Sequence, residues 1–255
     1  MLLAIDVGNS KVAFGIFEDS KLKTSLSVAT GVHRLADEYA SLLFNLLPYH
    51  QVTKSDIKEA IMCSVVPPLV PVFQEVCQRY LGIPLLTVGP GVRTGVRIAL
   101  DNPREVGGDR IVNAAAAYRL YGGPAIVIDM GTATTFDVIS KEGDYLGGAI
   151  APGMEMATEA LYTRTARLPR IELIRPHNAI GKNTVNAMQS GVIFGYVGLV
   201  EGLVARIARE LEGKAKVIAT GGYADVIARE TQVIEEVNRH LTLHGLQLIH
   251  DLNRI

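Results

Sequence analysis

The sequence contains no tryptophan, two cysteines and almost no net charge, and each of these shortages excludes a class of protein. Lysine and arginine number 25 against 26 aspartate and glutamate residues, a net charge of −1. The chain therefore lacks the positive field that draws a protein to nucleic acid or to an anionic membrane. Cys63 and Cys77 stand in apolar surroundings and form no disulfide framework or metal-binding pattern. We expect two reduced, buried thiols in a cytoplasmic protein that binds no nucleic acid.

Long hydrophobic runs are also missing. The most apolar stretch, residues 191–204, contains four glycines and Glu201 and falls short of the roughly 20 apolar residues that a bilayer requires. The first ten residues carry no basic segment, and Asp6 interrupts their apolar run, so they do not resemble a signal peptide. We therefore expect no membrane association. Hydrophobic residues nevertheless make up 48% of the chain, which excludes wholesale disorder.

An internal repeat divides the chain into two halves. LAIDVG at 3–8 matches IVIDMG at 126–131, an offset of 123 residues. In both copies a strand-like apolar run ends at Asp-x-Gly, and a second apolar stretch leads into a hairpin. Helical patterns lie at 35–47, 72–80, 104–121 and 185–211, and strand patterns lie at 59–66 and 216–220. We predict an α/β fold built twice, in halves 1–121 and 122–255, with a ligand-binding cleft between the halves.

The two Asp-x-Gly turns give the first functional signal. Glycine lets backbone N–H groups approach a ligand closely, and neighbouring hydroxyls can hold phosphate oxygens; these hydroxyls belong to Ser10, Thr132, Thr134 and Thr135. Asp6 and Asp129 would repel a phosphate directly, so each should act through a cation. One such turn alone would be ordinary hairpin chemistry, but the pair indicates a nucleotide bound with its metal.

Six segments carry a resemblance to a known family. They are DVGNS at 6–10, DNPREVGGDR at 101–110, DMGTATTFD at 129–137, GGAIAPG at 147–153, IGKNT at 180–184 and ATGG at 219–222. In this order, and over nearly the whole chain, they resemble type III pantothenate kinase. The resemblance implies two duplicated RNase H-like halves of the actin and sugar-kinase superfamily. It also implies ATP-dependent phosphorylation of pantothenate to 4′-phosphopantothenate, the first committed step towards coenzyme A.

The resemblance places the chemistry in the segment DNPREVGGDR. Asp109 would be the general base that takes the proton from the substrate hydroxyl as it attacks the γ-phosphoryl group. Arg110 would bind the pantothenate carboxylate. Gly107 and Gly108 would let the substrate approach closely, which would explain two residues that each cost roughly 1 kcal/mol in a helix relative to alanine. Leu100 stands at a substrate-binding position where tyrosine is common in the family.

The residues that would bind the nucleotide and the cations lie in the two copies of the repeat. Asp6 would reach the Mg²⁺ bound to ATP, and the phosphate loop would comprise Asp6, Val7, Gly8, Asn9, Ser10, Lys11, Val12 and Ala13. Thr132 would contact the ATP phosphates, and Asp129 would bind a monovalent cation, K⁺ or NH₄⁺. Thr184 would touch pantothenate from the partner subunit of a homodimer. Serine at position 10 keeps the hydroxyl where threonine is commoner, and Lys11 adds a positive charge.

Two other interpretations stay open. Leu100 lacks the hydroxyl and the stacking surface of a tyrosine, which keeps open a kinase for another small hydroxylated acid or a sugar. A non-catalytic nucleotide-binding accessory protein with the same fold is the second alternative. The joint presence of Asp6, Asp109, Arg110 and Asp129 argues against it, because such a protein has no need of a base and two cation-binding carboxylates.

Overall fold

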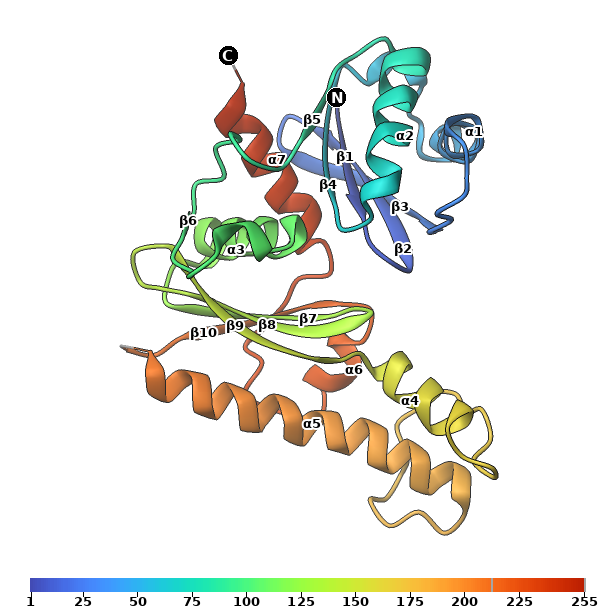
Figure 1. Ribbon diagram of the computed structural model, residues 1–255, viewed down its shortest axis with the longest axis vertical. Helices are drawn as coiled ribbons and strands as arrows, with labels where there is room; N and C mark the ends of the chain where they lie inside the picture. Colours follow the sequence, from blue (N-terminus) through green and yellow to red (C-terminus); the bar gives the residue numbers. More distant parts are fainter. Residues whose placement is uncertain (212, 255) are drawn as a thin grey trace. The chain divides into compact units, whose positions relative to one another are not determined.

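The computed structural model describes residues 1–211 and 213–254, and the chain forms two compact units (Figure 1). Unit 1 contains residues 1–97, residues 102–116 and the segment from His240 onward, whereas unit 2 contains residues 98–101 and 117–239. Each unit is built around one mixed β-sheet.

The sheet of unit 1 has the strand order β3-β2-β1-β4-β5. β1 (Leu2–Val7), β2 (Lys11–Glu18) and β3 (Lys21–Ala29) are joined as antiparallel hairpins, and β4 (Glu59–Ser64) and β5 (Leu85–Thr87) continue parallel to β1. Almost every side chain of β1 and β4 is buried, as expected for central strands covered on both faces. The predicted strand at 59–66 is thereby confirmed.

Helices cover both faces of this sheet. α1 (Ala36–Leu46) and α2 (Val70–Glu75), which continues as a π-helical turn through Leu81, pack against one face. The other face meets α7 (Leu241–Asn253) and the first part of α3 (Gly108–Tyr121). Side chains at alternate positions of β1 therefore enter two different cores. The second core contains Leu2, Ala4, Ile61, Cys63, Val112, Leu246 and others.

Unit 2 repeats the same topology. Its sheet has the order β11-β10-β7-β8-β9-β6, made of β7 (Ala125–Met130), β8 (Ala133–Ile139), β9 (Asp144–Pro152), β10 (Lys216–Gly221), β11 (Glu236–Val237) and β6 (Arg97–Ile98). β7, β8 and β9 are antiparallel neighbours, while β10 and β11 run parallel to β7. These five strands correspond one by one to β1, β2, β3, β4 and β5. The predicted duplication is confirmed.

The helices α4 (Met154–Thr163), α5 (Thr184–Glu210) and α6 (Ala224–Ala228) supply one apolar core of unit 2. In the described part of the chain, α5 is the one helix that is long and apolar enough to cross a membrane, judged by length and composition. The apolar stretch 191–204 was too short for this, but the helix extends beyond that stretch at both ends. A core helix meets the same criterion, and Ile193 and Val200 of α5 are fully buried against the sheet.

One predicted helix starts later than expected. The pattern at 104–121 predicted one continuous helix, whereas residues 103–105 form a 3₁₀ turn and α3 begins at Gly108. Asn102 caps the short turn by accepting a hydrogen bond from the Arg104 N–H at 3.4 Å. The glycine pair at 107 and 108 thus lies at the start of the helix, where its conformational cost is smaller than in a helix interior.

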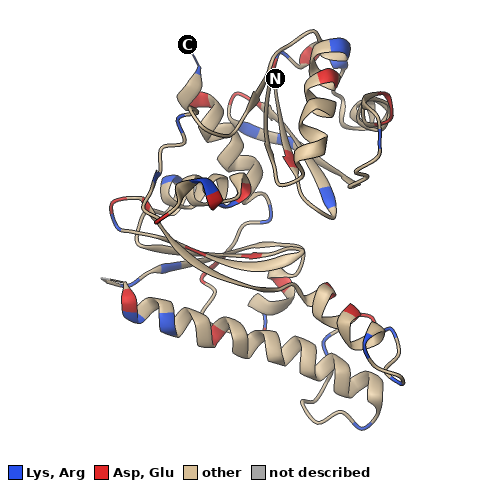
Figure 2. Ribbon diagram, viewed as in Figure 1, with Lys and Arg blue, Asp and Glu red and all other residues tan. Residues whose placement is uncertain are grey.

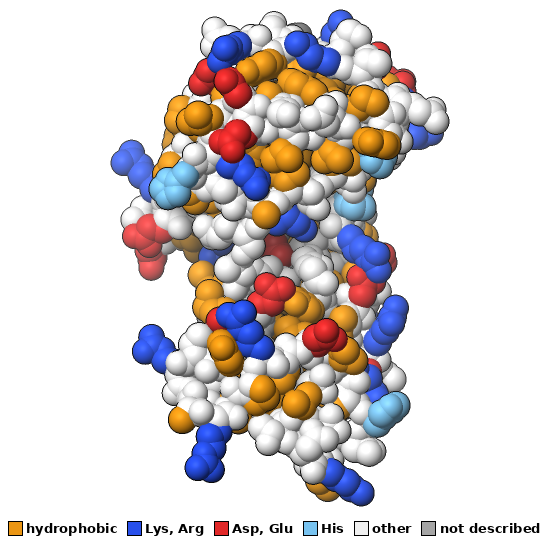
Figure 3. Space-filling view, turned by 90° about the vertical axis from the view of Figure 1, so that its right-hand side faces the viewer, with side chains coloured by type: hydrophobic (Ala, Val, Ile, Leu, Met, Phe, Trp, Pro, Cys, Tyr) orange, Lys and Arg blue, Asp and Glu red, His pale blue; other side chains and the backbone are white. Residues whose placement is uncertain are grey.

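Charged residues of both signs are interspersed along the elements of each unit (Figure 2). The face drawn in Figure 3 likewise shows hydrophobic side chains with positive and negative groups between them. This distribution matches the near-zero net charge.

Candidate active site

The predicted phosphate loop is the tight hairpin between β1 and β2. The Gly8 N–H donates to the Lys11 carbonyl at 3.0 Å, and the Thr30 hydroxyl donates to the Gly8 carbonyl at 2.7 Å. A β-carbon on Gly8 would lie 3.0 Å from the Lys11 carbonyl oxygen, so only glycine fits without displacement. The hairpin exposes Asn9, Ser10 and Lys11, whereas Val7 and Val12 are fully buried and can offer only backbone groups to a ligand.

Asp6 stands at the end of β1 on the face that otherwise enters an apolar core. It pairs in register with Cys63 of β4, and the Cys63 thiol donates to Oδ1 of Asp6 with the sulfur at 3.4 Å. Burial and, to a lesser extent, the nearby Asp109 raise the pKa of the Asp6 carboxyl to about 6, against the lowering effects of the Cys63 thiol and Lys11. The folded protein therefore holds this carboxylate at a free-energy cost.

Asp109 lies in the first turn of α3, where a helix N-terminus favours a negative charge. Its Oδ1 accepts a hydrogen bond from the Arg110 N–H at 2.8 Å. Burial raises the pKa of Asp109, while the backbone N–H and the guanidinium of Arg110 lower it. A raised pKa makes the carboxylate a stronger base, which suits proton abstraction near neutral pH.

One of the two glycines before Asp109 has a steric reason in unit 1. A β-carbon on Gly107 would lie 2.5 Å from Oδ1 of Asp109 and would displace the carboxylate, whereas one on Gly108 would lie 3.7 Å from Cβ of Cys63, an ordinary van der Waals contact. Unit 1 thus brings Asp6, Cys63 and Asp109 together. The sequence predicts that Cys63 is a buried core thiol and gives it no role in the site. The pairing register of β1 and β4 places it beside Asp6.

In unit 2, Asp129 occupies the position of β7 that corresponds to Asp6 in β1. It is opposite Thr135 of β8 and Thr220 of β10, and residues paired in this way project on the same face of a sheet. Thr132 is exposed in the turn after β7, and its carbonyl accepts a hydrogen bond from the Gly153 N–H at 3.1 Å. One carboxylate and two hydroxyls on one face form an oxygen-rich donor set, which suits a hard monovalent cation.

No group of three or more histidine, cysteine, aspartate or glutamate side chains within residues 1–211 and 213–254 is arranged to hold a metal ion. Any cation at Asp6 or Asp129 therefore needs further oxygen ligands from phosphate, hydroxyl or water. Mg²⁺ commonly binds one or two carboxylates together with substrate phosphates, and the Asp6 carboxylate fits that requirement.

The other predicted substrate residues are distributed over both units. Arg110 follows Asp109 in unit 1, whereas Leu100 lies in unit 2. A β-carbon placed on Gly147 would lie 3.1 Å from Cδ2 of Leu100. Thr184 opens α5 and is exposed. It lines a groove of about 810 Å³ between α4 and α5, whose walls include the apolar side chains of Leu161, Leu168, Met188 and Val192.

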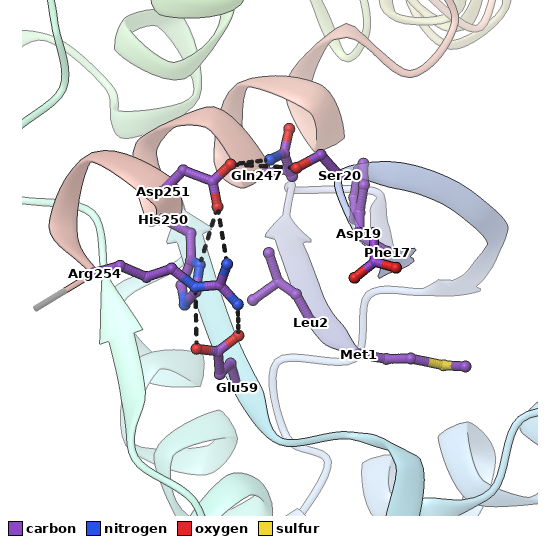
Figure 4. Close-up of a pocket in the computed structure, with 10 residues that line it drawn as sticks. All are labelled: Met1, Leu2, Phe17, Asp19, Ser20, Glu59, Gln247, His250, Asp251 and Arg254. Atoms are coloured by element: carbon purple, nitrogen blue, oxygen red, sulfur yellow. Dashed lines mark hydrogen bonds and ion pairs between the residues drawn. The ribbon is translucent and has the colours of Figure 1, made fainter.

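A second, smaller cavity of about 80 Å³ lies in unit 1, beside the first residues of β1 and thus at the opposite end of that strand from Asp6 (Figure 4). Its polar groups are mostly paired with one another: Arg254 donates to Glu59 at 2.5 Å, and Gln247 donates to Asp251 at 2.5 Å. The Arg254–Glu59 contact fastens the end of α7 to the start of β4, whereas the Gln247–Asp251 contact lies within α7. Neither Asp6 nor Asp109 lines this cavity.

Two units with the same five-strand topology, each presenting an aspartate near the end of its first strand, define a class of protein by its fold: the actin and sugar-kinase fold. Comparison with solved structures agrees. A conserved Baf family transcriptional activator from Campylobacter jejuni aligns with a TM-score of 0.64 and 20% identity, covering 98% of each chain. An inorganic polyphosphate/ATP-glucomannokinase from Arthrobacter aligns with a TM-score of 0.50 and 13% identity over 99% of both chains.

Sequence comparison then narrows the class to one family. The type III pantothenate kinase family model matches residues 2–206. A type III pantothenate kinase from Dehalococcoides mccartyi strain CBDB1 is 52% identical over 254 residues, covering 100% of this chain and 97% of the relative. The type III pantothenate kinase of Moorella thermoacetica is 51% identical, covering 99% of this chain and 100% of the relative. The chain belongs to the type III pantothenate kinase family.

Proposed function

We propose that this enzyme transfers the γ-phosphoryl group of ATP to the primary hydroxyl of pantothenate, with Asp109 as the general base. The products are 4′-phosphopantothenate and ADP. The single observation that supports this proposal most is the proximity of two half-buried carboxyl groups in unit 1, Asp6 and Asp109. Burial raises the pKa of both carboxyls, and the Asp109 charge contributes to the rise at Asp6. Such an arrangement is characteristic of functional sites.

Asp109 would take the hydroxyl proton while the pantothenate oxygen forms its bond to the γ-phosphorus and the bond to the β-phosphate oxygen breaks. A carboxylate whose pKa is raised by burial accepts that proton more readily than an exposed one. The hydrogen bond from the Arg110 N–H to Oδ1 fixes the orientation of the group. Arg110 itself would bind the carboxylate of pantothenate through its guanidinium.

Asp6 and the hairpin 6–13 would hold ATP with its Mg²⁺. Bound there, Mg²⁺ neutralises charge on the phosphate oxygens. The exposed residues Asn9, Ser10 and Lys11 would contact the phosphates with N–H, hydroxyl and ammonium groups. Val7, Gly8, Val12 and Ala13 would shape the hairpin backbone.

Asp129 would bind K⁺ or NH₄⁺, supported by the hydroxyls of Thr135 and Thr220 on the same face of the sheet. Thr132, exposed in the following turn, would contact ATP phosphates. Gly107, Gly108, Leu100 and Thr184 would contact pantothenate, Thr184 from the partner subunit of a homodimer. The two free cysteines are compatible with a reducing, cytoplasmic location.

The test replaces Asp109 by asparagine, which keeps the shape and removes the base. We expect kcat with pantothenate to fall by roughly 10²- to 10⁴-fold, with little change in the KM for ATP. Asp101→Asn is the matched control, since Asp101 is an exposed aspartate in the same segment, and it should retain near-normal turnover. Near-normal activity of Asp109→Asn would exclude Asp109 as the base.

A coupled ATP-consumption assay tests the identity of the substrate. Pantothenate should support turnover, and other small hydroxylated acids and sugars offered at equal concentration should not. A faster reaction with one of those compounds would favour the alternative acceptor that Leu100 leaves open.

A further inference from the structure

We infer that Cys63 is a positioning residue for Asp6: its thiol holds Oδ1 of the carboxylate so that Asp6 presents its other oxygen to the metal of the bound nucleotide. The inference rests on the proposed role of Asp6 in binding Mg-ATP. The structural basis is the hydrogen bond from the Cys63 sulfur to Oδ1 at 3.4 Å. No second hydrogen bond from the described residues reaches the Asp6 carboxylate.

The environment of Cys63 explains why its thiol matters. Side chains at alternate positions of β1 share one face, so Leu2, Ala4 and Asp6 all project towards α3 and α7. The first two belong to an apolar core together with Cys63, which is fully buried. Asp6 is thus a carboxylate at the rim of an apolar cluster, and the thiol is the hydrogen-bond donor that the cluster offers to it. A carboxylate without a donor would adopt several orientations.

Cys63 lies between its partner strand and the start of α3. The β1–β4 pairing sets it directly opposite Asp6, and Gly108 at the start of α3 lies above it, with 3.7 Å between Cβ of Cys63 and a β-carbon built on the glycine. Burial and the carboxylates of Asp6 and Asp109 raise the pKa of the Cys63 thiol well above its usual range. The group therefore remains an S–H donor and does not serve as a nucleophile.

The experiment compares three variants at position 63 by isothermal titration calorimetry with Mg-ATP, without pantothenate. Cys63→Ala and Cys63→Val remove the donor, whereas Cys63→Ser keeps one of similar size. We expect the donor-free variants to bind Mg-ATP roughly 3- to 10-fold more weakly, as for the loss of one hydrogen bond. Cys63→Ser should remain within about twofold of the wild type, and the KM for pantothenate should not change in any variant.

Cys77→Ala is the matched control. Cys77 is also a fully buried free cysteine, but it lies on the π-helical turn that continues α2 and belongs to the apolar core on the other face of the sheet. Its replacement should lower the thermal unfolding temperature as Cys63→Ala does and leave the affinity for Mg-ATP unchanged. A purely structural role for Cys63 would make the two alanine variants behave alike in both measurements. Repeating the titration with metal-free ATP in EDTA should abolish the difference between Cys63→Ala and wild type.

Asp6→Asn separates the two ways in which the inference could fail. If this variant binds Mg-ATP as well as the wild type does, the proposed role of Asp6 is wrong and the role of Cys63 is wrong with it. If Asp6→Asn loses affinity while Cys63→Ala and Cys63→Val keep theirs, the proposed function stands and the inference about Cys63 is overturned. A serine variant as weak as the alanine variant would also overturn it.

Discussion

Replacement of Asp6 by asparagine is expected to stabilise the nucleotide-free protein while it abolishes kinase turnover. Burial, together with the Asp109 charge, moves the pKa of the Asp6 carboxyl from 3.8 to about 6. Since one pKa unit corresponds to 1.36 kcal/mol, ionised Asp6 costs the folded state at most about 3 kcal/mol at pH 8. Asparagine has nearly the same shape and carries no charge, so the variant should recover most of this free energy.

The pH dependence of the gain follows from the direction of the shift. The folded state binds the Asp6 proton more tightly than the unfolded state does, so stability is lost as the pH rises from 3.8 through about 6. The free-energy cost of ionised Asp6 is absent below the pKa of the unfolded state, 3.8, and reaches its full value above the pKa of the folded state, about 6. The free-energy advantage of Asp6→Asn should therefore be largest at pH 8 and fall to roughly half of that value at pH 5.

Urea unfolding followed by circular dichroism, without nucleotide at pH 8 and pH 5, measures this difference as a change in midpoint at constant slope. Asp19→Asn serves as the control, because Asp19 is exposed and its left-handed backbone conformation suits asparagine. It should leave the midpoint unchanged at both pH values. The reasoning is refuted if Asp6→Asn is no more stable than wild type at pH 8, or if its advantage is the same at pH 5.

The remaining predictions concern two residues of unit 2, Asp129 and Gly148, with a control variant in unit 1. Asp129→Ala should abolish the activation by K⁺ or NH₄⁺ relative to Na⁺, measured as turnover in the three chloride salts; an unchanged salt response would show that Asp129 does not bind the cation. Gly148→Ala should destabilise the protein by roughly 1–3 kcal/mol through overpacking, because its β-carbon would collide with the Phe136 carbonyl on the neighbouring strand. Gly89→Ala is the control, because its β-carbon meets nothing within 4 Å, and it should unfold at the same urea concentration as the wild type. An equal loss of unfolding free energy in both glycine variants would contradict the steric account.

Much of the fold could be predicted because the chain repeats itself. The match of residues 3–8 with 126–131 predicted two equivalent α/β halves, and the corresponding strand orders confirm it. Residues 185–211 predicted one long helix, which α5 matches within a residue at each end. Such features depend on local periodicity and chain order, which a single sequence displays directly.

Features that depend on tertiary contacts could not be predicted in this way. Nothing in residues 241–253 shows that α7 packs on the sheet of unit 1, because an amphipathic helix fits either sheet equally well. The neighbourhood of Asp6 and Cys63 depends on the register of two strands 57 residues apart in the chain. Their apolar runs specify that both are buried, but they do not specify which residues are opposite each other.

The place of α7 has a consequence for how the chain acquires its structure during translation. The helix follows the whole of unit 2 in the sequence, yet it covers the face of the first sheet that carries Cys63. The ribosome thus completes residues 117–239 before the last cover for that face emerges, and until then the apolar side chains of β1 and β4 on this face stay partly open to water. A nascent chain that stalls before His240 would expose them to chaperones and proteases.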